Sequence, residues 1–192
     1  MAGQKLRFRI VGAVPLVMHN GRLANPADEF ARAIKEISSK RSKVDADYEE
    51  MGRLEWLGSL YLSKGELCIP GYVLEGALVG RGGAARKQKM GKRAAAGLFV
   101  MNDFPLEYDG PRNPNELWKL EDFRLVRLVV INNSRVVRTR PIFQEWAANV
   151  EIEFNDELVN PDDVRLWMAT AGHEVGLMDW RPRCGRFGVQ EL

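Results

Sequence analysis

The stretch FRLVRLVVINNSRVVRTRPI, residues 123–142, contributes most to the predicted fold. Its first part, up to Ile131, is dense in β-branched residues and predicts a strand. Asn132-Asn133-Ser134 has the composition of a turn, so a second strand is expected from Arg135 onwards. The stretch therefore predicts a β-hairpin inside a domain that also contains helices.

Outward from this hairpin, the chain alternates between strand and helix patterns. In residues 145–154, for example, apolar side chains alternate with glutamates, which predicts a strand with one buried face. The order of elements approximates the βαββαβ order of a ferredoxin-like, or RRM-like, α+β palm. We expect one domain over residues 1–192, with inserted helical and basic loop segments at about 20–60 and 81–120. The remaining elements of the palm are strands at 5–14 and 186–192 and helices at 72–79 and 161–175.

Two asparagine-proline pairs predict helix starts, because asparagine caps a helix and proline is tolerated at its first position. Asn160-Pro161 is followed by Asp162 and Asp163, which suit the first turn of the 161–175 helix. Asn25-Pro26 predicts a helix that runs to about Ile37, with Asp28 in its first turn. A further helix is expected over about 45–60.

Length and composition limit the possible protein classes. The chain has 192 residues, 28 Lys and Arg, 26 Asp and Glu, and a net charge of +2, which excludes a bulk polycation. No apolar run reaches the roughly 18 residues of a membrane span, and no secretory signal is expected. The two cysteines, Cys68 and Cys184, make no disulfide framework, so we expect a cytoplasmic protein without membrane partners.

Positive charge is concentrated locally. Residues 76–102 contain no acidic side chain, which leaves open a solvated surface loop or a phosphate-binding loop. Arginines also recur along the hairpin of residues 123–142, as contacts to a nucleic acid backbone would require. The basic residues in the acid-free stretch are Arg81, Arg86, Lys87, Lys89, Lys92 and Arg93, and a second, smaller cluster contains Lys40, Arg41 and Lys43.

The segment 176–189, GLMDWRPRCGRFGV, combines glycines with arginines. Glycine lets backbone amides approach a phosphate closely, and arginine adds positive charge. The alternative is a tight connection between helix and strand that needs glycine for its own geometry. Cys184 lies between Arg183 and Arg186, which could lower its thiol pKa, but an ordinary structural thiol is the simpler interpretation.

Enzymatic motifs are not found in the sequence. The histidines and cysteines lack metal-ligand spacing, and neither a Walker loop, GxSxG nor GxGxxG occurs. The carboxylates form no clear catalytic pair, and Asp28 is interpreted as an acid at a helix N-terminus. We therefore expect no catalytic residues, no metal site and no cofactor.

Three segments together resemble the RAMP superfamily of CRISPR-associated proteins. Residues 12–21, GAVPLVMHNG, resemble the family's first strand and the loop after it. Residues 69–78, IPGYVLEGAL, are similar to the motif that opens its first helix, with Tyr72 and Val73 where serine is common. Residues 176–187 resemble its glycine-rich loop, although Met178 and Cys184 depart from the pattern.

The resemblance implies a non-catalytic backbone subunit of a multisubunit effector complex. Such a subunit binds guide RNA, forms a filament with copies of itself, contacts other effector subunits and presents the guide to complementary target nucleic acid. The residues implied in RNA binding are the two basic clusters named above together with His19, Asn20, Gly176, Arg181, Arg183, Gly185 and Arg186.

Two alternatives stay open at the level of sequence. One is a ribonuclease of the same superfamily that cleaves target RNA or processes guide RNA, with Asp28 as the nearest aspartate after the first strand. The other is an oligomeric assembly protein that binds no nucleic acid, in which case the basic loops are ordinary surface.

Overall fold

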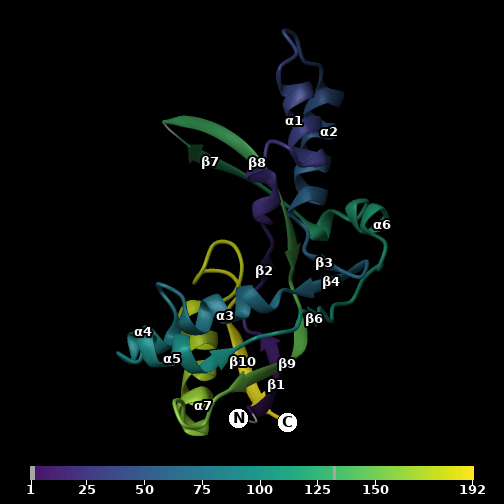
Figure 1. The fold of residues 1–192 in the computed structure, drawn as a ribbon. Helices are drawn as coiled ribbons and strands as arrows, with labels where there is room; N and C mark the ends of the chain where they lie inside the picture. Colours follow the sequence, from purple (N-terminus) through teal and green to yellow (C-terminus); the bar gives the residue numbers. More distant parts are fainter. Residues whose placement is uncertain (1–2, 132) are drawn as a thin grey trace. The chain divides into compact units, whose positions relative to one another are not determined.

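The computed structural model describes residues 3–131 and 133–192, a mixed α+β chain with open antiparallel sheets (Figure 1). The chain divides into two compact units. Unit 1 comprises Met1–Leu16, Leu62–Asp109 and Glu145–Leu192, and unit 2 comprises Val17–Tyr61 and Gly110–Gln144. Whether the chain folds as a single domain stays a prediction.

The main sheet of unit 1 has four strands in the order β10-β1-β9-β5. All of its neighbouring strands are antiparallel, and their bounds are β1 (Gln4–Gly12), β5 (Leu98–Phe99), β9 (Ala147–Phe154) and β10 (Phe187–Glu191). The register places Phe8 opposite Val150 and Arg7 opposite Glu151. One face of the sheet is therefore apolar and the other is charged.

Helices cover the apolar face of this sheet. The first is α3 (Gly71–Val79) and the second is α7 (Pro161–Thr170), which continues into the π-helical turn η3 (Ala171–Val175). Leu74 of α3 and Trp167 of α7 are fully buried. They form the core of unit 1 with Phe8, Ile10, Val150, Ile152 and Phe154 from the strands.

Two smaller parts complete unit 1. Strands β3 (Leu62–Ser63), β4 (Glu66–Ile69) and β6 (Phe104–Pro105) form a small antiparallel sheet. The short helices α4 (Ala84–Lys87) and α5 (Gly91–Gly97) follow α3 and carry the predicted basic segment.

Unit 2 consists of a helical pair and a β-hairpin. Helices α1 (Glu29–Ser38) and α2 (Asp45–Ser59) pack against each other, and β7 (Arg124–Ile131) pairs with β8 (Ser134–Phe143). Buried Glu55 of α2 accepts hydrogen bonds from Arg138 and Arg140 of β8, which joins the helices to the hairpin. The shorter elements are η1 (Gly21–Ala24), α6 (Pro114–Trp118) and η2 (Glu121–Phe123), and β2 (Leu16–Val17) lies where the chain passes between units.

Several sequence predictions are confirmed. The strand expected at 5–14 is β1, and the helix expected over about 45–60 is α2. Asn160 caps α7, and its side chain accepts from the Asp162 N–H. The expected place of the 123–142 hairpin in the main sheet is wrong. The hairpin belongs to unit 2, and the two-residue strand β5 pairs with β9 instead. The expected helix start at Asn25-Pro26 is also wrong, because α1 begins at Glu29.

Candidate nucleic-acid interface

The basic segment of unit 1 is a folded surface. Ala84, Ala85 and Ala94 are fully buried and anchor α4 and α5 to the core of the unit. The side chains around them face outward and line a concavity of about 510 Å³, formed by Arg86, Lys89, Met90, Gly91, Lys92 and Arg93. The backbone that carries these exposed cations is therefore anchored to the core of the unit.

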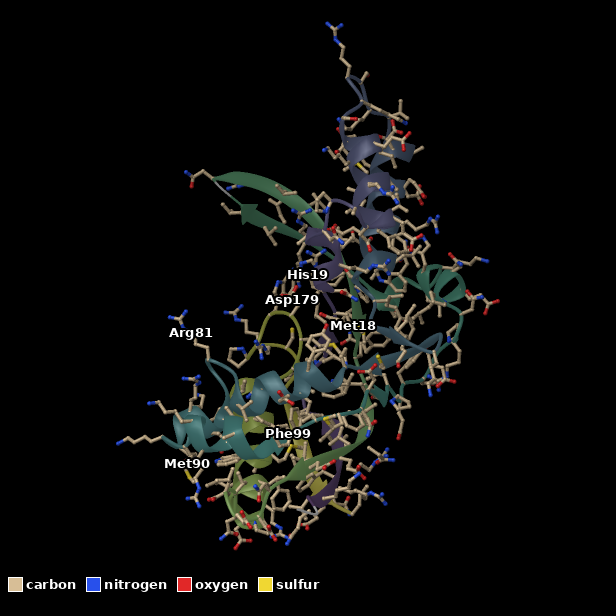
Figure 2. All side chains as sticks on the ribbon, in the orientation of Figure 1. Met18, His19, Arg81, Met90, Phe99 and Asp179 are labelled. Carbon is tan, nitrogen blue, oxygen red and sulfur yellow. The ribbon has the colours of Figure 1, made fainter. Side chains whose placement is uncertain are left out.

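Two of its cations have partners and the others remain available. Lys87 forms an ion pair with Glu174 at 3.1 Å, and the Arg93 side chain donates to the Leu158 carbonyl. No carboxylate of residues 3–131 or 133–192 pairs with the remaining cations of the segment, and the Arg81 side chain points away from the ribbon (Figure 2). We call Arg86, Lys89 and Lys92 the cationic cluster, and a polyanion would relieve its mutual repulsion.

The glycines of the 176–186 loop serve the loop itself. Gly176 and Gly185 have φ values of +76° and +75°, which glycine tolerates best. A Cβ at Gly185 would lie 2.0 Å from the Leu177 carbonyl oxygen. The Leu177 N–H donates to the Gly185 carbonyl, and the Gly185 N–H donates to Pro15, so these amides are already used.

The arginines of this loop differ in exposure. Arg181 and Arg183 are exposed, whereas Arg186 is half-buried and its Nε has no hydrogen-bond partner in the described part of the chain. Burial raises the pKa of the Cys184 thiol and Asp179 raises it further, which outweighs the opposite effect of Arg183. The thiol is therefore not activated by its flanking arginines.

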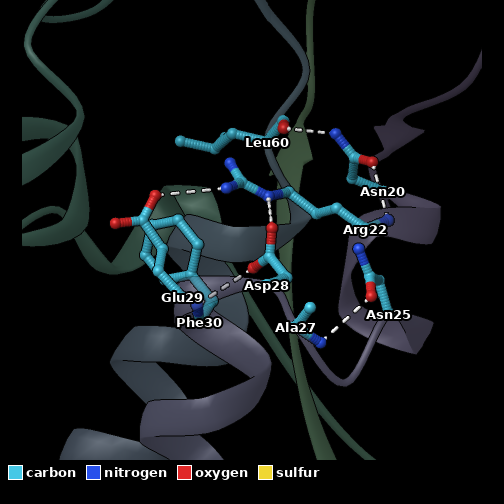
Figure 3. A network of polar contacts seen from close by, with 8 residues as sticks. All are labelled: Asn20, Arg22, Asn25, Ala27, Asp28, Glu29, Phe30 and Leu60. Atoms are coloured by element: carbon cyan, nitrogen blue, oxygen red, sulfur yellow. Dashed lines mark hydrogen bonds and ion pairs between the residues drawn. The ribbon is translucent and has the colours of Figure 1, made fainter.

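His19 and Asn20 belong to unit 2, where Asn20 has a structural role (Figure 3). Its side chain accepts from the Arg22 N–H at 3.0 Å and donates to the Leu60 carbonyl at 3.0 Å. The exposed His19 accepts a hydrogen bond from the Tyr61 hydroxyl through its carbonyl oxygen. These contacts fix the loop that precedes η1.

Asp28 is the N-cap of α1 and not a first-turn residue (Figure 3). One carboxylate oxygen accepts from the Phe30 N–H at 2.9 Å, and the other accepts from Arg22 Nε at 2.7 Å. Partial burial raises the pKa of this carboxyl, but the hydrogen bonds from Arg22 and Phe30 outweigh it and hold the pKa below its usual value. Both oxygens of Asp28 are therefore engaged in folding contacts.

The smaller basic cluster lies in the loop between α1 and α2. Lys40 forms an ion pair with Asp47 at 2.6 Å, and Lys43 donates to the Lys40 carbonyl. The Lys40 hydrogen bond is the main reason that the pKa of Asp47 is below its usual value. Arg41 is exposed and has no ion pair in the described ranges.

The basic side chains of β1 are neutralised in the folded chain. Lys5 and Arg7 pair with Glu151 at 2.7 and 2.9 Å, and Arg9 pairs with Glu107 at 2.7 Å. The hydrogen bond from Lys5, followed by that from Arg7, lowers the pKa of Glu151. Lys5, Arg7 and Arg9 alternate with apolar residues in the sequence, but their partners on β9 and at Glu107 are visible only in the fold.

The predicted RNA-binding residues are divided between the two units. Unit 2 holds His19, Asn20, Lys40, Arg41 and Lys43, and unit 1 holds the cationic cluster with Arg81, Lys87, Arg93, Gly176, Arg181, Arg183, Gly185 and Arg186. Sequence reasoning missed a groove of about 630 Å³ in unit 2, between the helical pair and β8. The arginines of the hairpin gave a partial signal, since Arg138 and Arg140 lie in its lining.

No protein-family model matches the chain, and no curated protein matches it. Across the two described ranges, no helix has both the length and the apolar character needed to cross a membrane. Within the same ranges, no group of three or more His, Cys, Asp or Glu side chains is placed to hold a metal ion.

Proposed function

We propose that the chain is a non-catalytic RNA-binding backbone subunit of a CRISPR-type effector complex in the cytoplasm. In this role it oligomerises along a guide RNA, contacts other effector subunits and presents the guide for pairing with a complementary target nucleic acid. The observation that carries the proposal is the cationic cluster of Arg86, Lys89 and Lys92, which lies on a folded segment and has no carboxylate partner among residues 3–131 and 133–192. Phosphate groups are the natural counter-charges for such a cluster.

The arrangement of unit 1 supports the choice of an RNA-binding palm. Counted along the chain, β1, β5, β9 and β10 are its first to fourth sheet strands, and they lie side by side in the order fourth, first, third, second. Helix α3 comes between the first and second strands, and α7 comes between the third and fourth. This agrees with the βαββαβ order that we propose for a ferredoxin-like, RRM-like palm.

We place the RNA along the basic loops and not across the open face of the sheet. RRM domains bind bases by stacking them on aromatic side chains of that face. Here the face carries the ion pairs of Lys5, Arg7 and Arg9 with glutamates, so its positive charge is already balanced. The cationic cluster and the exposed Arg181 and Arg183 are better placed to meet phosphates.

The ribonuclease alternative receives less support. A general acid, general base or metal ligand at Asp28 would need a carboxylate oxygen free to act on substrate. Both oxygens of Asp28 are occupied, one by the N-terminus of α1 and one by Arg22. These contacts favour the role of a helix cap.

The test is a salt titration of binding to a single-stranded RNA, measured by fluorescence anisotropy. The variant replaces Arg86, Lys89 and Lys92 with glutamine. If each contacts one phosphate, the slope of log K against log salt should fall in magnitude by about 2, and affinity near 0.1 M salt should fall at least about tenfold.

A matched variant tests whether the effect depends on position. It replaces Lys35, Lys64 and Lys119 with glutamine as well. These three lysines are exposed and have no ion pair in the described ranges. The slope of log K against log salt should therefore equal that of the original chain. Equal slopes for the cluster variant and the original chain would remove the cluster from the RNA interface.

A further inference from the structure

Strand β8 of unit 2 has one edge that faces away from β7. In an antiparallel ribbon, successive residues direct their N–H and C=O groups alternately to one edge and to the other. The Thr139 N–H donates to Glu55 of α2 at 2.9 Å, and the Pro141 carbonyl accepts from the Met18 N–H at 3.0 Å. Thr139 and Pro141 therefore direct their backbone groups away from β7, and the alternation assigns Val137 to the same edge.

The outward backbone groups of Val137 have no partner. Val137 lies opposite Leu128 in the ladder with β7. Across the described ranges, neither its N–H nor its C=O has a hydrogen-bond partner on the other side. The contact of Met18 with Pro141 places β2 at the base of the ribbon, so β2 does not cover this part of β8. Unpaired backbone groups at a sheet edge are a template for a further strand.

The open edge borders the groove of about 630 Å³ between β8 and the helical pair. This volume lies within the roughly 300–1,000 Å³ of ligand-binding clefts. Ala31 and Ile34 of α1 and Met51 of α2 form an apolar wall of the groove. Although α1 is strongly amphipathic in sequence, none of its residues is buried, because its apolar side lines this groove. Figure 1 shows the α1–α2 pair and the β7–β8 hairpin of unit 2 diverging from their common base.

The two faces of β8 beside the open edge differ in their chemistry. Val137 is 55% exposed and lies on the same face as Leu128, its partner in the ladder. Leu128 alternates along β7 with two further exposed aliphatic residues, Val126 and Val130. Arg138 lies on the opposite face, and its side chain is 35% exposed. Because successive side chains of a strand point to opposite faces, a strand added here should alternate apolar and acidic residues.

The groove has an excess of positive charge. Among the described residues that line it, Glu55 is the one acid. Its carboxylate lies 3.1 Å from Arg138 and 2.6 Å from Arg140. Two guanidinium groups therefore share one carboxylate, and an acidic side chain from a ligand would balance the remaining charge.

We propose that the groove binds an extended segment of another protein, which adds to β8 as an antiparallel strand. The residue opposite Val137 exchanges both backbone hydrogen bonds with it, and its apolar side chain lies on the aliphatic face. The residues before and after it are acidic and meet Arg138 on the other face. Antiparallel addition is expected because parallel pairing is slightly less stable.

The chain's own acidic strand is not available for this role. Strand β9 alternates apolar and acidic residues over 150–154, VEIEF. It is held in the main sheet of unit 1, paired with β1 along its length and with β5 at its end. The segment is therefore assigned to a different protein. This inference goes beyond the proposed function and does not depend on RNA binding.

A peptide fits the open edge better than a nucleic acid does. A phosphate group accepts hydrogen bonds, so it can satisfy the Val137 N–H but leaves the Val137 C=O unpaired. A peptide backbone carries a donor and an acceptor on each residue and satisfies both groups. The aliphatic face of the ribbon is also stabilised by burial against apolar side chains.

A synthetic peptide of alternating sequence tests the proposal. The probe is a capped, fluorescein-labelled peptide, Glu-Val-Glu-Val-Glu-Val-Glu, and its binding to the full chain is measured by fluorescence anisotropy. It should bind saturably with a Kd below about 1 mM. A peptide of the same composition, with its valines and glutamates in two separate blocks, cannot match both faces of β8. This control peptide should bind at least about tenfold more weakly.

Methylation of the probe's backbone tests the strand pairing without changing the protein. In the proposed register, the valines donate their N–H groups to β8, whereas the N–H groups of the glutamates point away from it. N-methylation of the valines should therefore lower the affinity at least about tenfold, and N-methylation of the glutamates should leave it nearly unchanged. Equal losses for the two methylated peptides would contradict antiparallel addition.

Two proline variants test which edge of the ribbon is used. Val137→Pro removes an outward N–H of β8 and retains the bonds to β7, as the native Pro141 does on the same edge. Leu128→Pro is the matched control, because it removes an outward N–H from the other edge of the ribbon, directly opposite Val137. Val137→Pro should lower peptide affinity at least about tenfold, and Leu128→Pro should retain it. Arg138→Gln leaves the backbone unchanged and should also weaken binding, whether or not the proline variants fold.

The results separate this inference from the test of RNA binding. The absence of saturable peptide binding, or affinity that Val137→Pro and Arg138→Gln leave unchanged, would overturn the proposal. If these two variants lose affinity for single-stranded RNA but not for the peptide, the edge is a nucleic-acid surface and the inference is wrong. The glutamine variant of the cationic cluster should lose RNA affinity and bind the peptide like the original chain. The peptide site and the proposed function can therefore fail independently.

Discussion

At the residue scale, Asp28 links the start of α1 to the loop before it. Removing its carboxylate in Asp28→Ala should lower the melting temperature by roughly 2–4 °C, since both the cap and the Arg22 pair are lost. Asp28→Asn keeps a capping oxygen and should cost less. Thermal unfolding followed by circular dichroism measures both variants.

The pH dependence of this effect has a defined sign. The pKa of Asp28 is lowered in the folded chain, so its carboxylate contributes stability above the unfolded pKa of about 3.9. That contribution is lost as the pH falls through the lower folded value. The difference in melting temperature between the original chain and Asp28→Asn should therefore shrink below about pH 4. A difference that stays constant from pH 7 to pH 3 would contradict the lowered pKa of Asp28.

The two thiols should be slow to react. Burial, with a further effect of Asp103, raises the pKa of Cys68 to about 11, and burial also raises that of Cys184. Because the thiolate is the reactive form, native protein at pH 8 should be alkylated by iodoacetamide far more slowly than unfolded protein. Mass spectrometry of timed samples measures the rate of alkylation. Fast labelling of Cys68 in the native state would contradict the burial of its thiol.

At the scale of elements, Glu55 connects α2 to β8. It accepts from Arg138, Arg140 and the Thr139 N–H. Replacing it with alanine leaves two arginines without this carboxylate, which should cost about 3–5 kcal/mol of unfolding free energy in urea. Glu55→Gln should cost less because it retains an acceptor, and a loss below about 1 kcal/mol in Glu55→Ala would show that the network does not support the hairpin.

The loop from 176 to 186 depends on its glycines in a similarly testable way. Gly185→Ala combines a φ of +75° with a close contact to Leu177 and should lose about 2–4 kcal/mol of unfolding free energy. Gly82→Ala is the matched control, because a Cβ there meets nothing within 4 Å. Equal stabilities of the two variants in urea would rule out the packing role of Gly185.

The elements also show where sequence reasoning succeeds. Strand β1 follows from strict alternation, and α7 follows from its asparagine cap, proline and first-turn acids. Strand β5 has two residues, too few to give a periodic pattern, and its place in the sheet is fixed by pairing with β9. The hairpin itself was predictable, but its assignment to unit 2 depends on long-range contacts such as Glu55 to Arg140.

The same limit applies to the candidate site. The absence of acids from residues 76–102 located the basic segment, and α4 and α5 display its cations. Sequence did not show that Lys87 pairs with Glu174, or that the glutamates of β9 neutralise Lys5 and Arg7. These partners lie far away in sequence, so only the fold separates the available cations from the paired ones.

At the scale of the whole molecule, the RNA-binding surface that we propose lies in unit 1, on the cationic cluster. RNA binding there needs no catalytic group, and the glutamine variant of the cluster tests it. This proposal rests on the positive charge of the cationic cluster, which no carboxylate of residues 3–131 and 133–192 pairs with.

The most direct test of the central claim is the nucleic acid that accompanies the protein. The chain should be produced alone and together with the products of its neighbouring genes, purified at moderate salt, and examined by the ratio of absorbance at 260 and 280 nm and by sequencing of any bound nucleic acid. The account predicts bound RNA of uniform length, in phase with a repeat, and its loss in the glutamine variant of Arg86, Lys89 and Lys92. Protein free of nucleic acid from both preparations would contradict the account and favour an assembly protein that binds no RNA.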